Sequence, residues 1–321
     1  MKFYFAPLEG IVGYIYRNAH NAYFNTNNLI DKYFAPFIAA NQSDTFKTKD
    51  LNYILPENNQ GVVLIPQLLT NNAKNFIQTS KRIAQFGYTE INLNLGCPSG
   101  TVVSKKKGSG FLAFRDELDR FLDDIYTQPI TDISIKTRLG KDDPEEFYAL
   151  MEIYNKYPIK ELIIHPRIQK DMYKNTPNLR IFKEALAISK NPVCYNGDIF
   201  TIQDYLNFTE AFPDVDTIML GRGLLANSSL IEQIEGHGKL DKQSLRMFHD
   251  QIYQEYQNIL YGEHNVLHKM KEIWFYMIQG FSNPENYEKK IRKSNRLHDY
   301  QAAVDSLFSE QEILENFGCS R

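Results

Sequence analysis

Short, almost wholly apolar segments alternate along most of this chain with stretches in which apolar residues recur at helical spacing. Eight of the apolar segments are rich in β-branched residues, as expected for parallel strands buried on both faces. They span 3–6, 32–38, 62–67, 90–95, 133–138, 161–165, 192–196 and 217–220. The clearest amphipathic stretches between them span 72–86, 117–126, 144–157 and 178–189. This alternation predicts an α/β fold built from eight strand–helix units.

The number of units favours a closed barrel over an open sheet. Eight units within about 230 residues are typical of a (β/α)8 TIM barrel, which usually needs about 250 residues. An open, doubly wound sheet would normally have a G-x-G-x-x-G turn after its first strand. The segment at that place, Ala6-Pro7-Leu8-Glu9-Gly10, lacks this pattern. We therefore predict a TIM barrel.

The strand pattern stops after Gly238, and the chain beyond it is predicted to be helical. Gly280 and then Asn283-Pro284 divide residues 240–317 into at least three helices. We predict a barrel domain over residues 1–236 and a smaller, all-helical domain over residues 237–321. Taken alone, a basic run in the second domain is most simply a solvated helix face. It consists of Lys289, Lys290, Arg292, Lys293 and Arg296.

Composition and charge narrow the class of protein. With 43% hydrophobic and 23% charged residues, the chain is ordinary for a globular protein. Its 36 basic and 39 acidic side chains give a net charge of −3, which argues against indiscriminate nucleic-acid binding but leaves room for local basic patches. Three widely spaced cysteines suggest reduced thiols and a cytoplasmic location. No stretch approaches the roughly 18 apolar residues of a membrane helix, so we expect no membrane association.

Polar residues follow nearly every predicted strand, at the end where TIM barrels bind their ligands. The segments 196–198 (Asn-Gly-Asp) and 221–223 (Gly-Arg-Gly) follow strands seven and eight. Barrels frequently bind phosphate after these two strands. Glycine lets backbone N–H groups approach an anion, and arginine adds a charge-assisted hydrogen bond. The sequence therefore predicts a phosphate-bearing ligand at the barrel mouth.

Lys136 and His165 lie in or directly after predicted strands and are candidates for chemistry. A lysine inside a barrel is costly unless it meets an anion or reacts. It could stabilise negative charge on a cofactor ring, form a Schiff base, or simply point outward to solvent. A lone histidine at a strand end is often a core residue, but Arg167 shares its face of the strand and favours ligand contact.

Cys97 lies between Gly96 and Pro98 in a tight loop directly after a strand, so its thiol is expected at the mouth. A thiol can donate a proton to carbon or act as a nucleophile. We predict no metal site, because no other cysteine and no histidine pair lies at ligand spacing. The lysines that follow this loop are either solvated or contact a polyanion; they are Lys105, Lys106 and Lys107.

These residues together resemble a known family. The segment 91–99, Ile-Asn-Leu-Asn-Leu-Gly-Cys-Pro-Ser, is similar to the signature of the tRNA-dihydrouridine synthases, flavin enzymes that reduce uridines in the tRNA D-loop. The other motifs agree in order, and the tail with His268-Lys269-Met270-Lys271 and Trp274 resembles the family's RNA-binding domain. The resemblance covers nearly the whole chain and looks most like the bacterial C-type subfamily.

The resemblance implies a role for each candidate. FMN would lie across the mouth, Lys136 would stabilise its reduced ring, Cys97 would protonate C5 of uracil after hydride transfer to C6, and NADPH or NADH would reduce the flavin again. The implied cofactor-binding residues are Pro7, Leu8, Glu9, Gln67, Lys136, His165, Asn196, Gly197, Asp198, Gly221 and Arg222. The implied tRNA-binding residues are Asn94, Arg167, Lys105, Lys106, Lys107, Lys290, Arg292, Lys293 and Arg296. The family resemblance favours a monomer.

Some positions depart from the family pattern, and other functions compete. Pro166 replaces a common glycine, which puts the role of Arg167 in doubt, and Thr70, Ile168 and the three-lysine loop also differ. One alternative is a flavin barrel that acts on a free pyrimidine, as dihydroorotate dehydrogenases do. Others are a lyase with Lys136 as Schiff base and a tRNA-binding module without activity.

Overall fold

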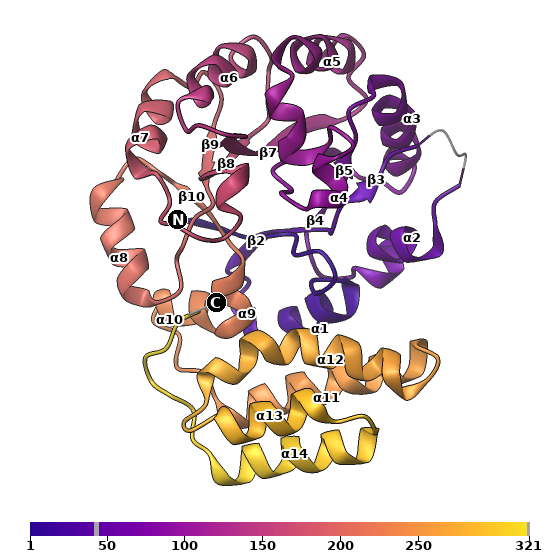
Figure 1. Ribbon diagram of the computed structural model, residues 1–321, viewed down its shortest axis with the longest axis vertical. Helices are drawn as coiled ribbons and strands as arrows, with labels where there is room; N and C mark the ends of the chain where they lie inside the picture. Colours follow the sequence, from indigo (N-terminus) through magenta and orange to yellow (C-terminus); the bar gives the residue numbers. More distant parts are fainter. Residues whose placement is uncertain (42–44, 320–321) are drawn as a thin grey trace.

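The computed structural model describes residues 1–41 and 45–319, and its centre is a curled sheet surrounded by helices (Figure 1). Every strand pair in the sheet is parallel. The strands are β1 (Lys2–Phe5), β2 (Ile30–Phe34), β3 (Ile38–Ala39), β4 (Leu64–Ile65), β5 (Gln67–Leu69), β6 (Glu90–Leu95), β7 (Asp132–Gly140), β8 (Leu162–Ile168), β9 (Val193–Tyr195) and β10 (Thr217–Leu220).

Two of the predicted strands are each split in two by a proline. Pro36 separates β2 from β3, and Pro66 separates β4 from β5, because proline has no N–H for the ladder. β2 pairs with β4, and β3 pairs with β5. In hydrogen-bonded order the sheet begins with β3 and ends with β4. β3 continues the strand that β2 begins, and β4 begins the strand that β5 continues. These two strands are neighbours, so the sheet closes on itself. The eight-stranded TIM barrel is therefore confirmed.

The four amphipathic stretches form the helices α3 (Ala73–Ala84), α5 (Arg115–Thr127), α6 (Glu146–Tyr154) and α7 (Leu179–Ile188). The side chains of Asn72 and Asn178 cap α3 and α7 by accepting backbone N–H bonds. The barrel also has α1 (Tyr14–Phe24), α2 (Thr48–Ile54), α4 (Gly100–Val103), α8 (Ile202–Ala211), α9 (Arg222–Ala226) and α10 (Leu230–Ile234), with 3-10 turns at Pro56–Asn58, Gly108–Ala113 and Gln169–Asp171. Within the described ranges, none of the helices is long and apolar enough to span a membrane.

The region after the barrel is helical, as predicted, and packs on one side of it (Figure 1). It contains α11 (Lys242–Ile259), α12 (Glu263–Met277), a 3-10 turn (Ile278–Gly280), α13 (Glu285–Lys293) and α14 (Leu297–Glu310). The break between α11 and α12 was not predicted; Gly262 allows it with a φ of +83°. In its core, Tyr300 accepts a hydrogen bond from Trp274 Nε1 at 2.7 Å and contacts His249 Nε2 at 2.6 Å.

The segment after α14 returns from the helical region to the barrel. Ile313 forms an antiparallel bridge with Phe281, and the ring of Phe317 packs against Gly280. Gly318 lies against Phe200 and Thr201, at the start of α8. Figure 1 accordingly shows the yellow segment after α14 running back to the barrel. This returning segment, residues 313–318, links the helical region to the loop after β9.

Candidate functional site

The barrel interior is apolar on one side and polar on the other. Side chains from β1, β2, β4, β8, β9 and β10 form a buried apolar cluster. The opposite side contains fully buried amides and a hydroxyl joined by hydrogen bonds. Gln67 Nε2 donates to Asn92 Oδ1 at 2.8 Å, and Asn92 Nδ2 donates to Ser134 Oγ at 2.9 Å. Asn94 Nδ2 donates to Gln67 Oε1 at 2.7 Å, so a chain of polar groups runs up toward the mouth.

This polar chain ends at the loop that presents Cys97. Asn94 Oδ1 accepts hydrogen bonds from the backbone N–H groups of Gly96 at 3.0 Å and Cys97 at 2.9 Å. On the other side of the loop, Ser109 Oγ donates to the Cys97 carbonyl at 2.8 Å. Gly108, at a φ of +56°, approaches so closely that an added Cβ would lie 2.7 Å from that carbonyl. The loop is therefore fixed from both sides.

The environment of Cys97 keeps its thiol protonated. The side chain is half-buried, and burial raises its pKa above the ordinary value, although the charges of Arg138 and Lys136 oppose the shift. A thiol with a raised pKa is neutral at pH 7 and is a weak nucleophile. It is suited to donating a proton instead.

Lys136 is a half-buried cation without a compensating carboxylate. It lies on β7, directly across the ladder from Asn94. Among the described residues, Lys136 makes no hydrogen bond or ion pair, and burial together with the charge of Arg138 lowers its pKa to about 7. A buried cation of this kind is costly unless an anion completes the site. The observation fits an anionic ligand beside Lys136.

His165 is surrounded by further positive charge. Its pKa lies well below the ordinary value, because of burial and then the charges of Arg138, Lys136, Arg167 and Arg222. The histidine is therefore neutral, and its Nε2 lies 3.1 Å from Arg167 Nη1, where it can accept a hydrogen bond. The mouth holds four cations around one neutral imidazole.

Asp198 is the carboxylate that balances part of this charge. It pairs with both terminal nitrogens of Arg167, and its Oδ1 accepts from Arg222 Nη2 at 2.8 Å. Arg167 is only 2% exposed and also donates to the carbonyls of Lys174 and Asn175. Asp198 and Arg167 therefore orient the side chains that they contact, Arg222 and His165. With Pro166 before it, Arg167 still lies in this charged cluster, but its side chain is buried.

The segments after β9 and β10 are shaped by close packing at their glycines. An added Cβ on Gly197 would lie 1.9 Å from the Tyr195 hydroxyl, and one on Gly223 would lie 2.3 Å from the Ile199 carbonyl. Larger residues cannot occupy these positions without a shift of the loops. Asn196 Nδ2 donates to the Met219 carbonyl at 2.8 Å and ties the two segments together.

Two residues at the mouth were not singled out as site residues from the sequence. Arg138 is 1% exposed and donates to the carbonyls of Gly96, Ile168 and Met172, which joins the cysteine loop to the loop after β8. Tyr173, on that second loop, has its ring 4.9 Å from the Arg222 guanidinium. The alternation of Arg138 with Lys136 on one strand was a usable signal, whereas nothing in the sequence indicated Tyr173.

The remaining predicted residues lie at the rim or outside the mouth. Pro7 and Leu8 are half-buried after β1, and Glu9 is exposed and pairs with Lys49 at 3.1 Å. Of the three lysines after α4, beside the cysteine loop, Lys105 and Lys106 are exposed and Lys107 is half-buried. The basic residues of α13 are exposed, and α12 separates them from the barrel (Figure 1); they are Lys290, Arg292 and Lys293, with Arg296 just beyond.

A model of the family described as "Dihydrouridine synthase (Dus)" matches residues 4–315. The chain is 25% identical to a probable tRNA-dihydrouridine synthase of Staphylococcus aureus (strain Mu50 / ATCC 700699) over 256 residues, which are 78% of this chain and 76% of that protein. It is 30% identical to tRNA-dihydrouridine synthase B of Pasteurella multocida (strain Pm70) over 155 residues, which are 47% of this chain and 46% of that protein.

Similar solved structures share the fold at low sequence identity. A 2-naphthoyl-CoA reductase superposes with a TM-score of 0.54 and 10% identity, over 73% of this chain and 50% of that one. A histamine dehydrogenase from Rhizobium sp. 4-9 superposes with a TM-score of 0.52 and 12% identity, over 73% and 46%. These likenesses support the barrel architecture described above.

Proposed function

This chain belongs to the dihydrouridine synthase family, and we propose that it reduces a D-loop uridine of tRNA to 5,6-dihydrouridine with FMN as cofactor. The observation that supports this most directly is the pairing of a protonated thiol, Cys97, with the uncompensated cation Lys136 at one barrel mouth. A redox cofactor that becomes anionic on reduction fits such a site, because fixed positive charge stabilises the anion that forms.

The residues present suit FMN. Lys136 would lie against the ring and supply positive charge, with neutral His165 beside it. Arg222 would bind the phosphate, oriented by Asp198. The backbone N–H groups of Gly197 and Gly221 would contribute further hydrogen bonds. Gln67 and Asn196 would line the same side, and Pro7, Leu8 and Glu9 would border the ring after β1.

The protein's part in the reaction is to hold the uracil and deliver a proton. When bound, reduced FMN supplies the hydride that C6 of the uracil accepts. The Sγ–H of Cys97 then donates its proton to C5, so that the C5–C6 double bond becomes single. Asn94 fixes the cysteine loop through its Oδ1. We assign NADPH or NADH as the source of the two electrons for the next turnover.

The substrate must be turned out of the folded tRNA to reach this mouth. We propose that residues 1–236 are the catalytic domain and residues 237–321 the tRNA-binding domain. The cations beside the mouth and those on α13 would bind phosphates and set the orientation of the tRNA. Arg167 acts by orienting His165 and Asp198. We expect a monomeric, cytoplasmic enzyme, and we assign no metal to it.

The first test is a visible spectrum of the purified protein, followed by additions of NADPH and then unmodified tRNA without oxygen. Flavin bands that bleach with NADPH and return with tRNA would support the proposal. Bands that return with a free pyrimidine but not with tRNA would favour a dihydroorotate dehydrogenase-like enzyme. A protein that takes up no FMN and is trapped by borohydride at Lys136 with a carbonyl substrate would favour the lyase.

A further inference from the structure

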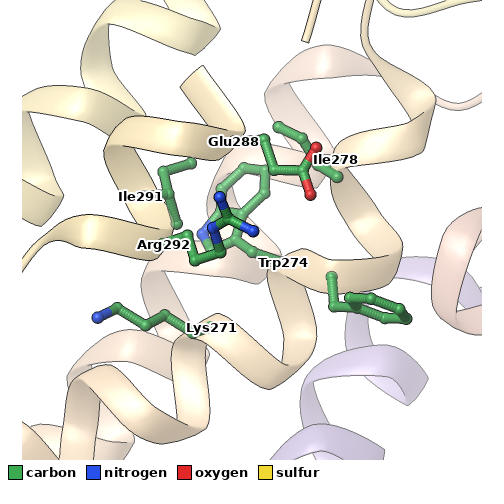
Figure 2. A pocket seen from close by; sticks show the side chains of 7 residues that line it. Lys271, Trp274, Ile278, Glu288, Ile291 and Arg292 are labelled. Carbon is green, nitrogen blue, oxygen red and sulfur yellow. The ribbon is translucent and has the colours of Figure 1, made fainter. Parts of the chain in front are cut away.

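A groove lies between α12 and α13 on the helical region, outside the barrel mouth (Figure 2). It is open to solvent and offers about 50 Å³ of space to a water-sized sphere. Its lining comes from both helices and from the 3-10 turn after α12, and consists of Lys271, Trp274, Phe275, Ile278, Glu288, Ile291 and Arg292. We call it the α12–α13 groove.

The floor of the groove is apolar and rigid. Trp274 is 3% exposed, and its Nε1 is held by the Tyr300 hydroxyl at 2.7 Å, so the indole cannot turn. Ile278 and Ile291 are buried beside it. Phe275 by contrast is 45% exposed at the rim, although it lies on the same helix. An aromatic ring presented to solvent next to an apolar hollow is typical of a binding surface.

The rim of the groove is mainly cationic. Within the part of the chain that the structure describes, Arg292 makes no hydrogen bond or ion pair, and its side chain lies beside Trp274 in the groove (Figure 2). Lys271 Nζ donates to the Ser294 carbonyl at 2.5 Å, which places its charge at the end of α13. Glu288 is the acidic residue among those lining the groove.

The opposite side of α12 faces the barrel mouth. Lys269 Nζ donates to the carbonyl of Gly10, just after β1, at 2.8 Å. Farther along α12, Tyr276 lies within electrostatic range of Tyr173 and Arg222 at the mouth. The groove and the mouth are therefore on two sides of one helix, about 10 Å across. A single RNA molecule at the mouth is within reach of the groove.

Resting on the proposed function, we propose that the α12–α13 groove binds a second, unstacked nucleobase of the same tRNA whose uridine enters the barrel. Proteins bind unpaired bases by stacking them on aromatic rings and guanidinium planes, with cations nearby for the backbone. Phe275 provides the aromatic ring and Arg292 the guanidinium plane, and Trp274 lies at the bottom of the groove. A phosphate alone would make no use of the aromatic and apolar lining.

The chain has a single tryptophan, and it lines this groove, which makes its fluorescence a specific probe. The FMN-loaded protein, excited where tyrosine does not absorb, is titrated with unmodified tRNA, with an RNA duplex without unpaired bases, and with inorganic phosphate. We expect saturable quenching of Trp274 by tRNA at the concentration at which tRNA binds. The duplex and phosphate should leave the emission unchanged.

Three variants separate base stacking from general charge. Phe275→Ala should weaken tRNA binding at least about fivefold without changing its salt dependence, because base stacking is uncharged. Arg292→Gln should lower both the affinity and the quenching at saturation. Lys293→Gln removes the same charge from the next position of α13, outside the groove. It should reduce the salt dependence but leave the quenching at saturation intact.

The possible failures are distinguishable. If tRNA binds and reoxidises the flavin while Trp274 emission stays constant and Phe275→Ala binds normally, the groove proposal is wrong and the proposed function stands. Equal quenching by the duplex or by phosphate would show a backbone or anion site and would also overturn it. If tRNA neither binds nor reoxidises the flavin, the proposed function itself fails.

Discussion

At the scale of single residues, the environment decides which group can donate a proton and which can hold charge. Cys97 and Lys136 are close enough to influence each other, yet burial moves both toward their neutral forms. Burial disfavours whichever form is charged, so a thiol retains its proton and an amine tends to lose one. An anionic cofactor reverses this tendency for the lysine and leaves the thiol as the acid.

Cys97→Ala should retain FMN and lose most turnover, because it removes only the proton donor. General acids typically contribute about a hundredfold or more to rate. The measurement is single-turnover reoxidation of NADPH-reduced protein by unmodified tRNA. Flavin reduction by NADPH should match the parent. A variant that reduces uridine at the parent rate would show that Cys97 is not the donor.

FMN should bind the flavin-free protein less tightly as pH rises above 7. The folded pKa of Lys136 is lowered to about 7, so above that pH the amine is largely neutral and must take up a proton when the anion binds. The dissociation constant is expected to rise up to about tenfold per pH unit between pH 7 and 9. Quenching of FMN fluorescence measures it. The Lys136→Met variant should bind FMN more weakly, and its dissociation constant should not rise with pH. If it rises as steeply as in the parent, the proton taken up on FMN binding belongs to another group.

How far the sequence predicts the site depends on the kind of contact. The rule that ligands bind at strand ends placed Cys97, Lys136 and His165 correctly in one mouth. It did not reveal that Asp198 is shared by two arginines, or that Asn94 fixes a loop. Those contacts join segments far apart in the chain, so only the folded arrangement shows them.

At the scale of elements, the barrel could be read from the strand pattern, but its irregularities could not. The eight apolar segments and the helices between them were predicted because buried parallel strands and amphipathic helices have distinct periodicities. The prolines at 36 and 66 signalled breaks that the predicted strands ignored. The end of α11 was missed because only Gly262 marks it.

The loop between β6 and α5 gives a matched pair of substitutions. Gly108→Ala would place a Cβ 2.7 Å from the Cys97 carbonyl at a backbone angle that favours glycine, so it should displace the cysteine. A shift of this kind is expected to lower the turnover number about tenfold to a hundredfold. Gly100→Ala, in the same loop, meets nothing within 4 Å and should be neutral. Equal kinetics for both variants would contradict the role assigned to this packing.

The amino ends of four strands form a second buried ionic cluster, remote from the mouth. Glu161 Oε1 accepts from the Tyr4 hydroxyl at 3.0 Å, and Lys32 lies 2.7 Å from Glu90 and 4.0 Å from Glu161. Burial raises the pKa of Glu161 to about 7, partly offset by Lys32. This carboxyl therefore retains its proton in the folded protein at a pH where the unfolded chain has lost it.

Stability should consequently fall as pH rises from about 4.5 to 7. Below the unfolded pKa the carboxyl is neutral in both states, and its contribution is lost as pH rises through the folded value. The loss from this group is on the order of 3 kcal/mol. The measurement is the free energy of unfolding in urea, for the parent and for Glu161→Gln at each pH. The difference between the two proteins gives the contribution of Glu161. A difference between the two that does not change with pH would mean that Glu161 ionises normally.

At the scale of the whole molecule, the helical region packs on one side of the barrel, where we propose that it orients the tRNA at the mouth. The charges of the chain nearly cancel, yet Lys290 and Lys293 lie exposed on α13, which α12 separates from the barrel. Net charge therefore gave little indication of the partner, and the basic run on α13 suggested RNA contact only together with the family resemblance. Only the fold shows that α12 lies between this run and the mouth.

Reversing Lys290 and Lys293 to glutamate should raise the KM for tRNA about tenfold and reduce its salt dependence. Flavin reduction by NADPH should not change. The matched control reverses Lys183 and Lys190, which are exposed near the outer helix α7, and alters net charge equally. If both double variants raise the KM to the same extent, the effect belongs to overall charge and not to α13.

The returning segment 313–318 also has a consequence for biosynthesis. A ribosome releases the barrel strands first, the helical region later, and this segment later still. Gly318 lies against Phe200, whose ring is 5.0 Å from the Arg222 guanidinium. Because domains tend to fold in the order in which they emerge, a nascent barrel would lack this cover over the loop where we propose that the FMN phosphate binds. Flavin should therefore be acquired after the helical region has been synthesised and docked, and ribosome-bound barrel intermediates should be colourless.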